Sequence, residues 1–306
     1  MSDWTKGFWA MIGVCLIWGL SPIYYRSLAS VPTLEVLAHR TLWSFLLFAA
    51  ILAGQRRLPQ LWAALTGPHL ARIALASLMV SINWGLFIWA VQAGHVVQSS
   101  LGYYIFPLVA VLLGMAIFGE RLSQAQGVAV ALAALAVGLL TWGLGVAPWV
   151  SLGLAMTFGI YGVIKKSLPL GPMLSVAAEV ALLSPLALGW LIAQALHLVP
   201  GSLAHPVMFG TDLRLSLLLI ASCVFTAVPL LLFSFAARRV GMATLGLMLY
   251  LNPTLQFFCA VVLFGEPFTH WHLIAFSMIW AALALYSLSS LRPVGAAPRG
   301  RARRRA

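Results

Sequence analysis

The sequence predicts an all-α integral membrane protein of ten transmembrane helices, built as two inverted five-helix repeats with the N and C termini in the cytoplasm. The first observation is composition: of 306 residues, 62% are hydrophobic and 8% are charged, whereas a soluble domain carries roughly 25% charged residues. The second is a motif that occurs twice in the chain. The third is the concentration of basic residues in alternate connectors.

Each predicted span follows from the requirement for about 20 mostly apolar residues to cross a bilayer. In chain order the ten stretches are 8–28, 33–54, 71–93, 96–118, 123–143, 148–166, 172–196, 214–237, 240–264 and 269–291. The first follows Lys6 and lacks a small-x-small cleavage site, so we expect it to be retained and not removed as a signal peptide. The longest connectors, 55–70 and 197–213, are too short to hold a soluble domain.

The connectors predict the orientation. Fifteen of the 18 basic residues lie in the N-terminus, the even-numbered connectors and the tail, whereas the opposite side has Arg26 and Arg214, and Arg40 lies within a span. Positive residues favour the cytoplasmic side, so both termini are expected there, which requires an even number of spans. The net charge of +12 is explained by this distribution and by a basic tail near anionic lipid, and no nucleic-acid partner is predicted.

The duplicated motif defines the repeats. Leu101-Gly102-Tyr103-Tyr104, Pro107 and Phe118-Gly119-Glu120 recur as Leu245-Gly246-Leu247-Met248, Pro253 and Phe264-Gly265-Glu266. A shift of 140 also aligns Arg26 with Lys166 and Pro32 with Pro172. We therefore predict a first repeat at 1–145, a second at 146–291 and a basic cytoplasmic tail at 292–306. Since five spans is an odd number, the second repeat enters from the opposite side, the arrangement of many secondary transporters with a midplane substrate site.

Ionisable residues within predicted spans are rare and therefore informative. The second span carries Glu35, His39 and Arg40, and Glu35 and His39 share a helix face because they are four residues apart. The repeat pairs His39 with Glu179 in the seventh span. A carboxylate there could meet a cation of the second span across the repeat interface. Such a cluster could anchor a substrate or link transport to protons, or it could be a structural ion pair, with Glu35 merely favouring a helix N-terminus.

A second group of candidates is aromatic or carries an amide. Its members are Asn83, Trp84, Trp89, Tyr103, Tyr161, Tyr250 and Asn252. Asn83 and Trp84 lie too deep in their span to belong to an interfacial aromatic belt. A lipid-facing amide at that depth would be costly, so Asn83 either lines a wet cavity or bonds to another helix.

Several residues are candidates for hinges or gates. They are Pro22, Gly102, Pro107, Pro229, Gly246 and Pro253. Proline removes a backbone hydrogen bond and kinks a helix, which serves either gating or curved packing. Gly119-Glu120 and Gly265-Glu266 are expected to end their helices as structural caps, with the glutamates meeting lipid headgroups.

The sequence offers no catalytic or metal-binding constellation. Cys15, Cys223 and Cys259 lie in apolar segments and are expected to be buried thiols. His270 and His272 are two residues apart, so they do not face each other on a helix. We therefore predict no enzyme activity, no metal and no cofactor.

The same residues carry a family resemblance that covers the chain to about residue 290. The matching stretches include His39-Arg40 with Trp43-Ser44, Asn83-Trp84 with Phe87-Ile88-Trp89, Ser100-Leu101-Gly102-Tyr103, Gly119-Glu120-Arg121, and Thr226 with Val228-Pro229-Leu230. The chain resembles EamA-type permeases of the drug/metabolite transporter superfamily, and within them the RarD-type proteins. The resemblance implies a multi-pass permease of the bacterial inner membrane with a cavity between its halves.

These observations together predict a secondary transporter that moves a small polar or amphipathic metabolite or drug by alternating access, with export as the expected direction. Trp84, Tyr103, Tyr161 and Tyr250 are expected to line the cavity, and Arg40 with His39 to attract an anionic group. The expected partners are membrane lipid, the small-molecule substrate, protons acting through Glu35 or Glu179, and a second copy in a homodimer. The alternatives are a passive facilitator without ion coupling, a membrane-embedded enzyme and a non-transporting scaffold.

Overall fold

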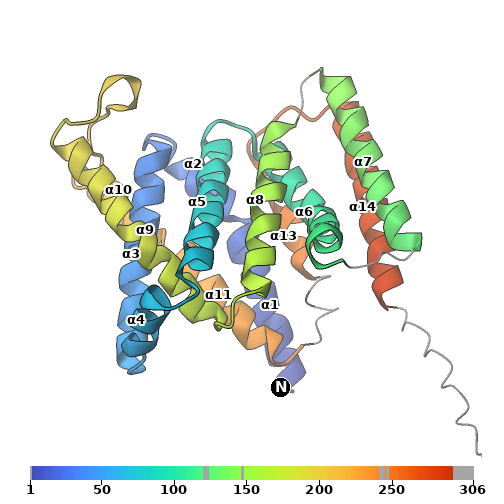
Figure 1. Cartoon of the computed structure of the whole chain (residues 1–306). Helices are drawn as coiled ribbons and strands as arrows, with labels where there is room; N and C mark the ends of the chain where they lie inside the picture. The colour runs from blue at the N-terminus through green and yellow to red at the C-terminus, as the bar shows by residue number, and fades with distance from the viewer. Residues whose placement is uncertain (1, 120–123, 146–147, 241–244, 246–247, 292–306) are drawn as a thin grey trace, which may run out of the picture.

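The chain folds as a bundle of α-helices in the computed structural model (Figure 1). The structure describes residues 2–119, 124–145, 148–240, 245 and 248–291, and these ranges contain no β-strand. The helices are α1 (Asp3–Gly19), α2 (Ser21–Ser27), α3 (Thr33–Gly54), α4 (Leu58–Thr66), α5 (Leu70–Gln92), α6 (Val96–Phe118), α7 (Gln124–Leu144), α8 (Trp149–Lys166), α9 (Pro172–Ala195), α10 (Leu213–Ala221), α11 (Val224–Ala237), α13 (Leu251–Phe258) and α14 (His270–Leu291). A 3₁₀ turn at Gly201–Leu203 precedes α10, and a π turn at Cys259–Leu263 continues α13.

Seven helical stretches of the described chain are long and apolar enough to cross a membrane. They are Asp3–Ser27, Thr33–Gly54, Leu70–Gln92, Val96–Ile117, Gln124–Gly143, Pro172–Ala195 and Leu213–Ala237. Each coincides with a predicted span. The other three predicted spans correspond to α8, which ends in Lys165 and Lys166, and to the shorter apolar helices Leu251–Leu263 and His270–Leu285. The chain is thus an all-helical protein with seven candidate spans by length and composition.

Two of these stretches are each made of two helices. α1 ends at Gly19, and α2 begins at Ser21 with Pro22 in its first turn. The first turn of a helix accepts proline because its N–H groups have no intrahelical partner there. Pro22 therefore begins a second helix and does not kink a continuous one. A similar break separates α10 from α11 at residues 222–223.

The other candidate hinge residues have different local settings. Pro107 lies inside α6 and Pro229 inside α11, whereas Pro253 is in the first turn of α13. Gly102 lies at a close helix contact, because a Cβ there would sit 2.8 Å from the carbonyl oxygen of Ser151 on α8. Gly246 lies outside the described residues. The absence of a side chain at Gly102 therefore permits the approach of α6 to α8, and hinge motion at these positions stays a prediction.

Helix packing brings together segments that are distant in sequence. α1 packs against α11, α3 against α9, and α5 and α6 against α8. α7 packs against α14, and Figure 1 shows this pair side by side at one end of the bundle. The largest buried apolar cluster includes residues of α5, α6, α7, α8 and α14. The polar residues discussed below lie where α3, α5, α9 and α11 meet, away from the α7–α14 end.

Two helix ends show how glycine and glutamate are used. Gly119 follows α6 with φ of 65°, a left-handed conformation that glycine adopts without strain, which confirms the predicted stop. Glu266 accepts hydrogen bonds from the backbone N–H groups of Val96 and Val97, each at 2.8 Å. The carboxylate of Glu266 therefore caps the N-terminus of α6, and its expected contact with headgroups stays a prediction. Glu120 lies outside the described residues.

Candidate functional site

Arg40 lies at the centre of the candidate site. Its side chain leaves α3 and is buried, with 5% of the residue exposed. Nε donates a hydrogen bond to Oγ1 of Thr226 on α11 at 3.0 Å, and the guanidinium carbon lies 4.0 Å from the ring centroid of Trp84 on α5. The ring of Tyr25 on α2 lies 5.8 Å away. Arg40 therefore joins helices from both predicted repeats.

The positive charge of Arg40 is not balanced by the described part of the chain. No described carboxylate forms an ion pair with its guanidinium. The neighbouring hydroxyl of Tyr25 is buried and has no hydrogen-bond partner among the described residues. Burying an uncompensated ion costs several kcal/mol even after the protein relaxes. An unbalanced arginine inside a membrane protein is accordingly a strong candidate for binding an anion.

Asn83 joins three helices beside this site by hydrogen bonds. On α5 its Nδ2 donates to the carbonyl oxygen of Leu154 and to Oγ1 of Thr157, both on α8 and both at 3.0 Å. Its Oδ1 accepts from the hydroxyl of Tyr103 on α6 at 3.3 Å. Of the two alternatives for this residue, the structure therefore shows bonding between helices. These bonds also fix the position of Trp84, the next residue on α5.

Glu179 has its own cation and is not paired with the second span. The residue is fully buried on α9, and its Oε1 lies 2.7 Å from Nζ of Lys165 on α8. Tyr161 donates to Oε2 at 3.0 Å, and Ser175 donates to Oε1 at 2.9 Å. The expected contact of Glu179 with a cation of α3 is therefore replaced by this local cluster. Glu179, Lys165 and Tyr161 together form a polar centre in which the carboxylate and ammonium charges balance each other.

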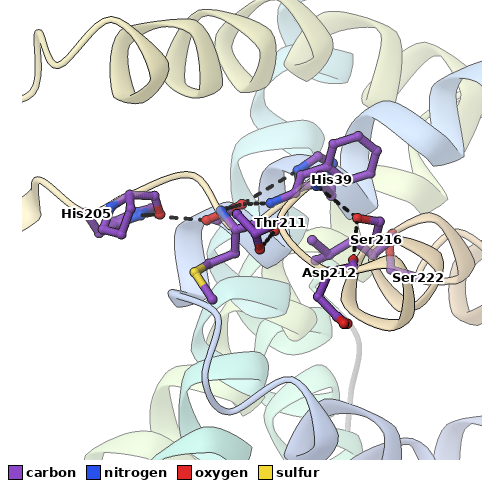
Figure 2. Close-up of polar contacts among 12 residues, drawn as sticks. His39, His205, Thr211, Asp212, Ser216 and Ser222 are labelled. Carbon is purple, nitrogen blue, oxygen red and sulfur yellow. Dashed lines mark hydrogen bonds and ion pairs between the residues drawn. The ribbon is translucent and has the colours of Figure 1, made fainter.

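Glu35 and His39 form a third polar cluster with the connector between α9 and α10. Oε1 of Glu35 accepts hydrogen bonds from the backbone N–H groups of Met208 at 2.8 Å and Phe209 at 3.1 Å. His205 Nδ1 lies 3.6 Å from Oε2, and His39 Nε2 lies 3.9 Å from Oε1. Figure 2 shows His205 and His39 on opposite sides of this group of polar contacts. The His39 ring also stacks on Phe209, with centroids 4.7 Å apart.

The remaining sequence candidates lie elsewhere. Trp89 packs against the rings of Trp149 and His95, with centroids 5.1 Å and 5.4 Å away, near the ends of their helices. Tyr250 directly precedes α13, and Asn252 accepts a hydrogen bond from Gln256 one turn along it. Neither Trp89 nor Asn252 has a contact with Arg40 among the described interactions. The expected part of all three residues in substrate binding stays a prediction.

The structure adds site residues that sequence reasoning did not select. Tyr25 and Thr226 contact Arg40, Lys165 balances Glu179, and His205 reaches Glu35. For Lys165 a signal existed: it is a basic residue at the end of the sixth predicted span, 14 residues before Glu179. Thr226 belongs to a stretch that carries the family resemblance, but the sequence gives no signal for its contact with Arg40, which is 186 residues away.

These features define a multi-pass, all-helical membrane protein with buried ionic groups on facing helices. Residues 5–142 match the EamA-like transporter family. A Streptomyces exfoliatus protein named Protein RarD is 42% identical over 291 residues, covering 94% of this chain and 89% of that protein. A Pseudomonas aeruginosa uncharacterized transporter is 40% identical over 295 residues, covering 96% and 97%. Protein RarD of Escherichia coli K12 is 36% identical over 287 residues, covering 94% and 95%.

This chain belongs to the EamA-like transporter family, and its full-length relatives include several proteins named RarD. A solved crystal structure also matches with a TM-score of 0.58 at 19% identity, covering 95% of this chain and 99% of the other. That similarity supports the fold over nearly the whole length.

Proposed function

We propose that this chain is a secondary transporter of the bacterial inner membrane that moves a small polar or amphipathic organic anion by alternating access, with export as the direction. In this proposal ten spans form two inverted repeats, 1–145 and 146–291, and the tail 292–306 lies in the cytoplasm near lipid headgroups. Membership of a transporter family supports transport over catalysis. The observation that carries the substrate class is the buried guanidinium of Arg40, which pairs with no carboxylate of the described residues.

Helix packing supports the inverted repeat. If the five spans of one half are exchanged for those of the other, the contact of α1 with α11 becomes that of α8 with α5. The contact of α6 with α8 becomes that of α13 with α1, and the pairs α3–α9, α6–α13 and α7–α14 map onto themselves. A two-fold relation between the halves requires this pattern, and it is the framework on which alternating access is built.

The correspondence extends to single residues. A Cβ on Gly19 of α1 would lie 2.7 Å from Cβ of Leu255 on α13, and a Cβ on Gly159 of α8 would lie 3.1 Å from Cγ1 of Val109 on α6. The shift of 140 that relates Gly19 to Gly159 and the shift of 146 that relates Val109 to Leu255 are those of the sequence repeat. Equivalent glycines therefore permit equivalent helix contacts in the two halves.

The substrate class follows from the chemistry around Arg40. A guanidinium presents five donors in a planar fork that fits a carboxylate or phosphate. Nε is used by Thr226, so the terminal nitrogens are the part of the fork that an anion would engage. The face of Trp84 beneath the guanidinium and the hydroxyl of Tyr25 beside it suit a substrate that also has an apolar or aromatic part.

Transport into liposomes tests this proposal. Purified protein is reconstituted into liposomes. The liposomes are loaded with a panel of labelled organic acids, together with neutral and cationic compounds of similar size. Chloramphenicol belongs in the panel because a Pseudomonas aeruginosa relative, 32% identical over 281 residues, is named chloramphenicol-sensitive protein RarD. We expect counterflow of at least one organic anion by the native chain and its loss in Arg40→Ala.

Two outcomes would change the proposal. Unchanged transport by Arg40→Ala would remove Arg40 from the substrate site. Counterflow that is strong but insensitive to an imposed pH gradient would identify a passive facilitator, whereas stimulation by the gradient supports coupling to protons.

A further inference from the structure

The connector between α9 and α10 is tied to the start of α3 by one buried carboxylate. This connector spans residues 196–212 and is among the longest in the chain. Its residues Met208 and Phe209 donate their backbone N–H groups to Oε1 of Glu35, and Phe209 also stacks on His39. Figure 2 shows how Thr211, Asp212 and Ser216 continue the chain from this contact into α10. The position of the connector thus depends on the acceptor strength of Glu35.

Several buried polar atoms in the cluster of Glu35, His39 and His205 have no hydrogen-bond partner among the described residues. Glu35 is fully buried, and Oε2 has no hydrogen-bond partner among the described residues. Both ring nitrogens of His39 and Nε2 of His205 are likewise buried without a partner there. Buried polar atoms are normally paired. Two imidazoles, those of His39 and His205, each lie within 4.0 Å of the Glu35 carboxylate, and several atoms of this cluster have no partner among the described residues, so the cluster forms a site that can exchange protons.

Other charged groups do not occupy this site. On α3 itself, Arg40 is directed to Thr226. Asp212 caps α10 by accepting from the N–H of Leu215, and Glu179 of α9 is paired with Lys165. Further groups on or near the helices packed against α3 act elsewhere. Arg72 of α5 donates to the carbonyl oxygen of Ser167, and Arg239, the second residue after α11, donates to the carbonyl oxygen of Phe235. Arg214 on α10 is exposed. Within the described chain, His39 and His205 are the charged or titratable groups that face Glu35.

The equivalent contact in the other half is built differently. Repeat symmetry relates the α9–α10 connector to the α3–α5 connector, which contains α4. α4 packs on α9 through Leu61 and Ala64, and Leu174 of α9 belongs to the same apolar cluster. The repeat equivalent of Glu35 is Ser175, which donates to Glu179 of its own helix. Among the described contacts, the α9–α10 connector is therefore held by an ionisable group and the α3–α5 connector by apolar packing. A proton can thus act on the contact of the α9–α10 connector.

We propose that Glu35 is a proton-binding site that latches the 196–212 connector, and that protonation of Glu35 releases it. This inference rests on the proposed function, whose topology of ten spans with cytoplasmic termini puts the connector and the start of α3 on the outward-facing side. An ionised carboxylate is a stronger acceptor for the Met208 and Phe209 N–H groups than a carboxylic acid. When Glu35 takes a proton on one oxygen, it becomes neutral and one of its oxygens becomes a donor, so the two backbone hydrogen bonds weaken and the connector can move.

Distance measurements between spin labels test the latch without a substrate. The labels are placed on Leu34 of α3 and Leu203 of the connector, which are 42% and 56% exposed. Neither side chain takes part in the described hydrogen bonds and ion pairs of Glu35. Cys15, Cys223 and Cys259 are replaced by alanine, and the protein is studied in lipid nanodiscs. Distances are measured between about pH 8 and about pH 4, a range in which carboxyl and imidazole side chains as classes change charge, and we expect a longer distance population to grow as pH falls.

The variants identify the group that takes the proton. In Glu35→Gln, which resembles the protonated side chain, we expect the ratio of released to latched connector to be raised roughly tenfold at about pH 8 and to lose its dependence on pH. Glu266→Gln is the matched control, because Glu266 also accepts two backbone N–H groups but lies at the start of α6. It is expected to behave as the native chain does.

Specific results would overturn the proposal. One is an acid response that persists in Glu35→Gln and is lost in His39→Gln or His205→Gln, which would place the proton on a histidine. Another is a native distance distribution that does not change with pH, which decides the question even if Glu35→Gln fails to fold. Neither result bears on anion transport through Arg40, which the liposome assay measures separately.

Discussion

Replacement of Arg40 by methionine separates a substrate-binding role from a structural one. Methionine keeps much of the length and apolar character of the side chain but removes the charge. In a structural ion pair this change would leave a buried carboxylate alone and cost about 3–5 kcal/mol of stability. No described carboxylate pairs with Arg40, so the loss is limited to the hydrogen bond with Thr226, about 1 kcal/mol, and the contact with Trp84, up to about 2 kcal/mol. Removing an uncompensated buried charge offsets these losses.

The effect on an anionic substrate is expected to be much larger than the effect on the fold. Truncating one partner of a buried, hydrogen-bonded charge pair costs about 2–5 kcal/mol of binding free energy. Since 1.4 kcal/mol corresponds to a factor of ten, a loss of about 3 kcal/mol would raise Kd roughly 100-fold. Arg40→Met should therefore lose anion affinity while its unfolding temperature stays close to that of the native chain.

The assay is equilibrium binding in nanodiscs, measured beside thermal unfolding of the same preparations. Arg239→Met is the matched control, because Arg239 also stacks on an aromatic ring, at 3.6 Å from the centroid of Phe235, but lies outside the site. It should leave Kd unchanged. A variant Arg40→Met that unfolds much more readily yet binds the anion normally would refute the reasoning and make Arg40 a structural residue.

Three further predictions concern stability. Lys165→Met should destabilise the protein by about 3 kcal/mol because it leaves the buried carboxylate of Glu179 without its cation. Adding Glu179→Gln should restore part of that loss in a double-mutant cycle measured by thermal unfolding. Independent, additive losses would contradict the pairing. Gly102→Ala should lower the free energy of unfolding by about 1–3 kcal/mol through overpacking. The control Gly162→Ala on α8 should be neutral or stabilising by up to about 1 kcal/mol, because a new Cβ there meets nothing within 4 Å. Equal effects of the two changes in denaturant titrations would argue against a close α6–α8 contact. Asn83→Leu should cost about 1–2 kcal/mol, because an interhelical hydrogen bond in a membrane contributes about 0.6 kcal/mol on average and Asn83 bonds to Leu154, Thr157 and Tyr103. Normal thermal stability of this variant would show that these bonds contribute little.

The helices could be predicted from the sequence because the bilayer makes composition decisive. Each of the seven candidate spans coincides with an apolar run of about 20 residues, and glycine at position 119 ends α6 as expected. The helix break at residue 20 is harder to predict from the sequence, because a proline in an apolar run is equally compatible with a kink and with a new first turn. Local sequence does not decide between them.

The candidate site was predictable in its rare charges but not in their partners. Glu35, Arg40 and Glu179 were found because ionisable residues in apolar runs are few. The partners of Glu35 are backbone N–H groups at residues 208 and 209, and every non-proline residue carries such a group, so sequence gives no signal for them. Glu179 was expected to reach across the repeats, but Lys165 on the neighbouring helix is a nearer source of positive charge.

Retention of metabolites by the purified protein tests the central claim most directly, namely that Arg40 is the anion-binding group of a transporter site. The native chain, Arg40→Met and Arg239→Met are incubated in nanodiscs with a bacterial metabolite extract, washed and analysed by mass spectrometry. We predict that the native chain and Arg239→Met retain the same compounds, each with a carboxylate or phosphate, and that Arg40→Met loses them. Retention of these anions by Arg40→Met, or enrichment of only neutral or cationic compounds by the native chain, would contradict the claim.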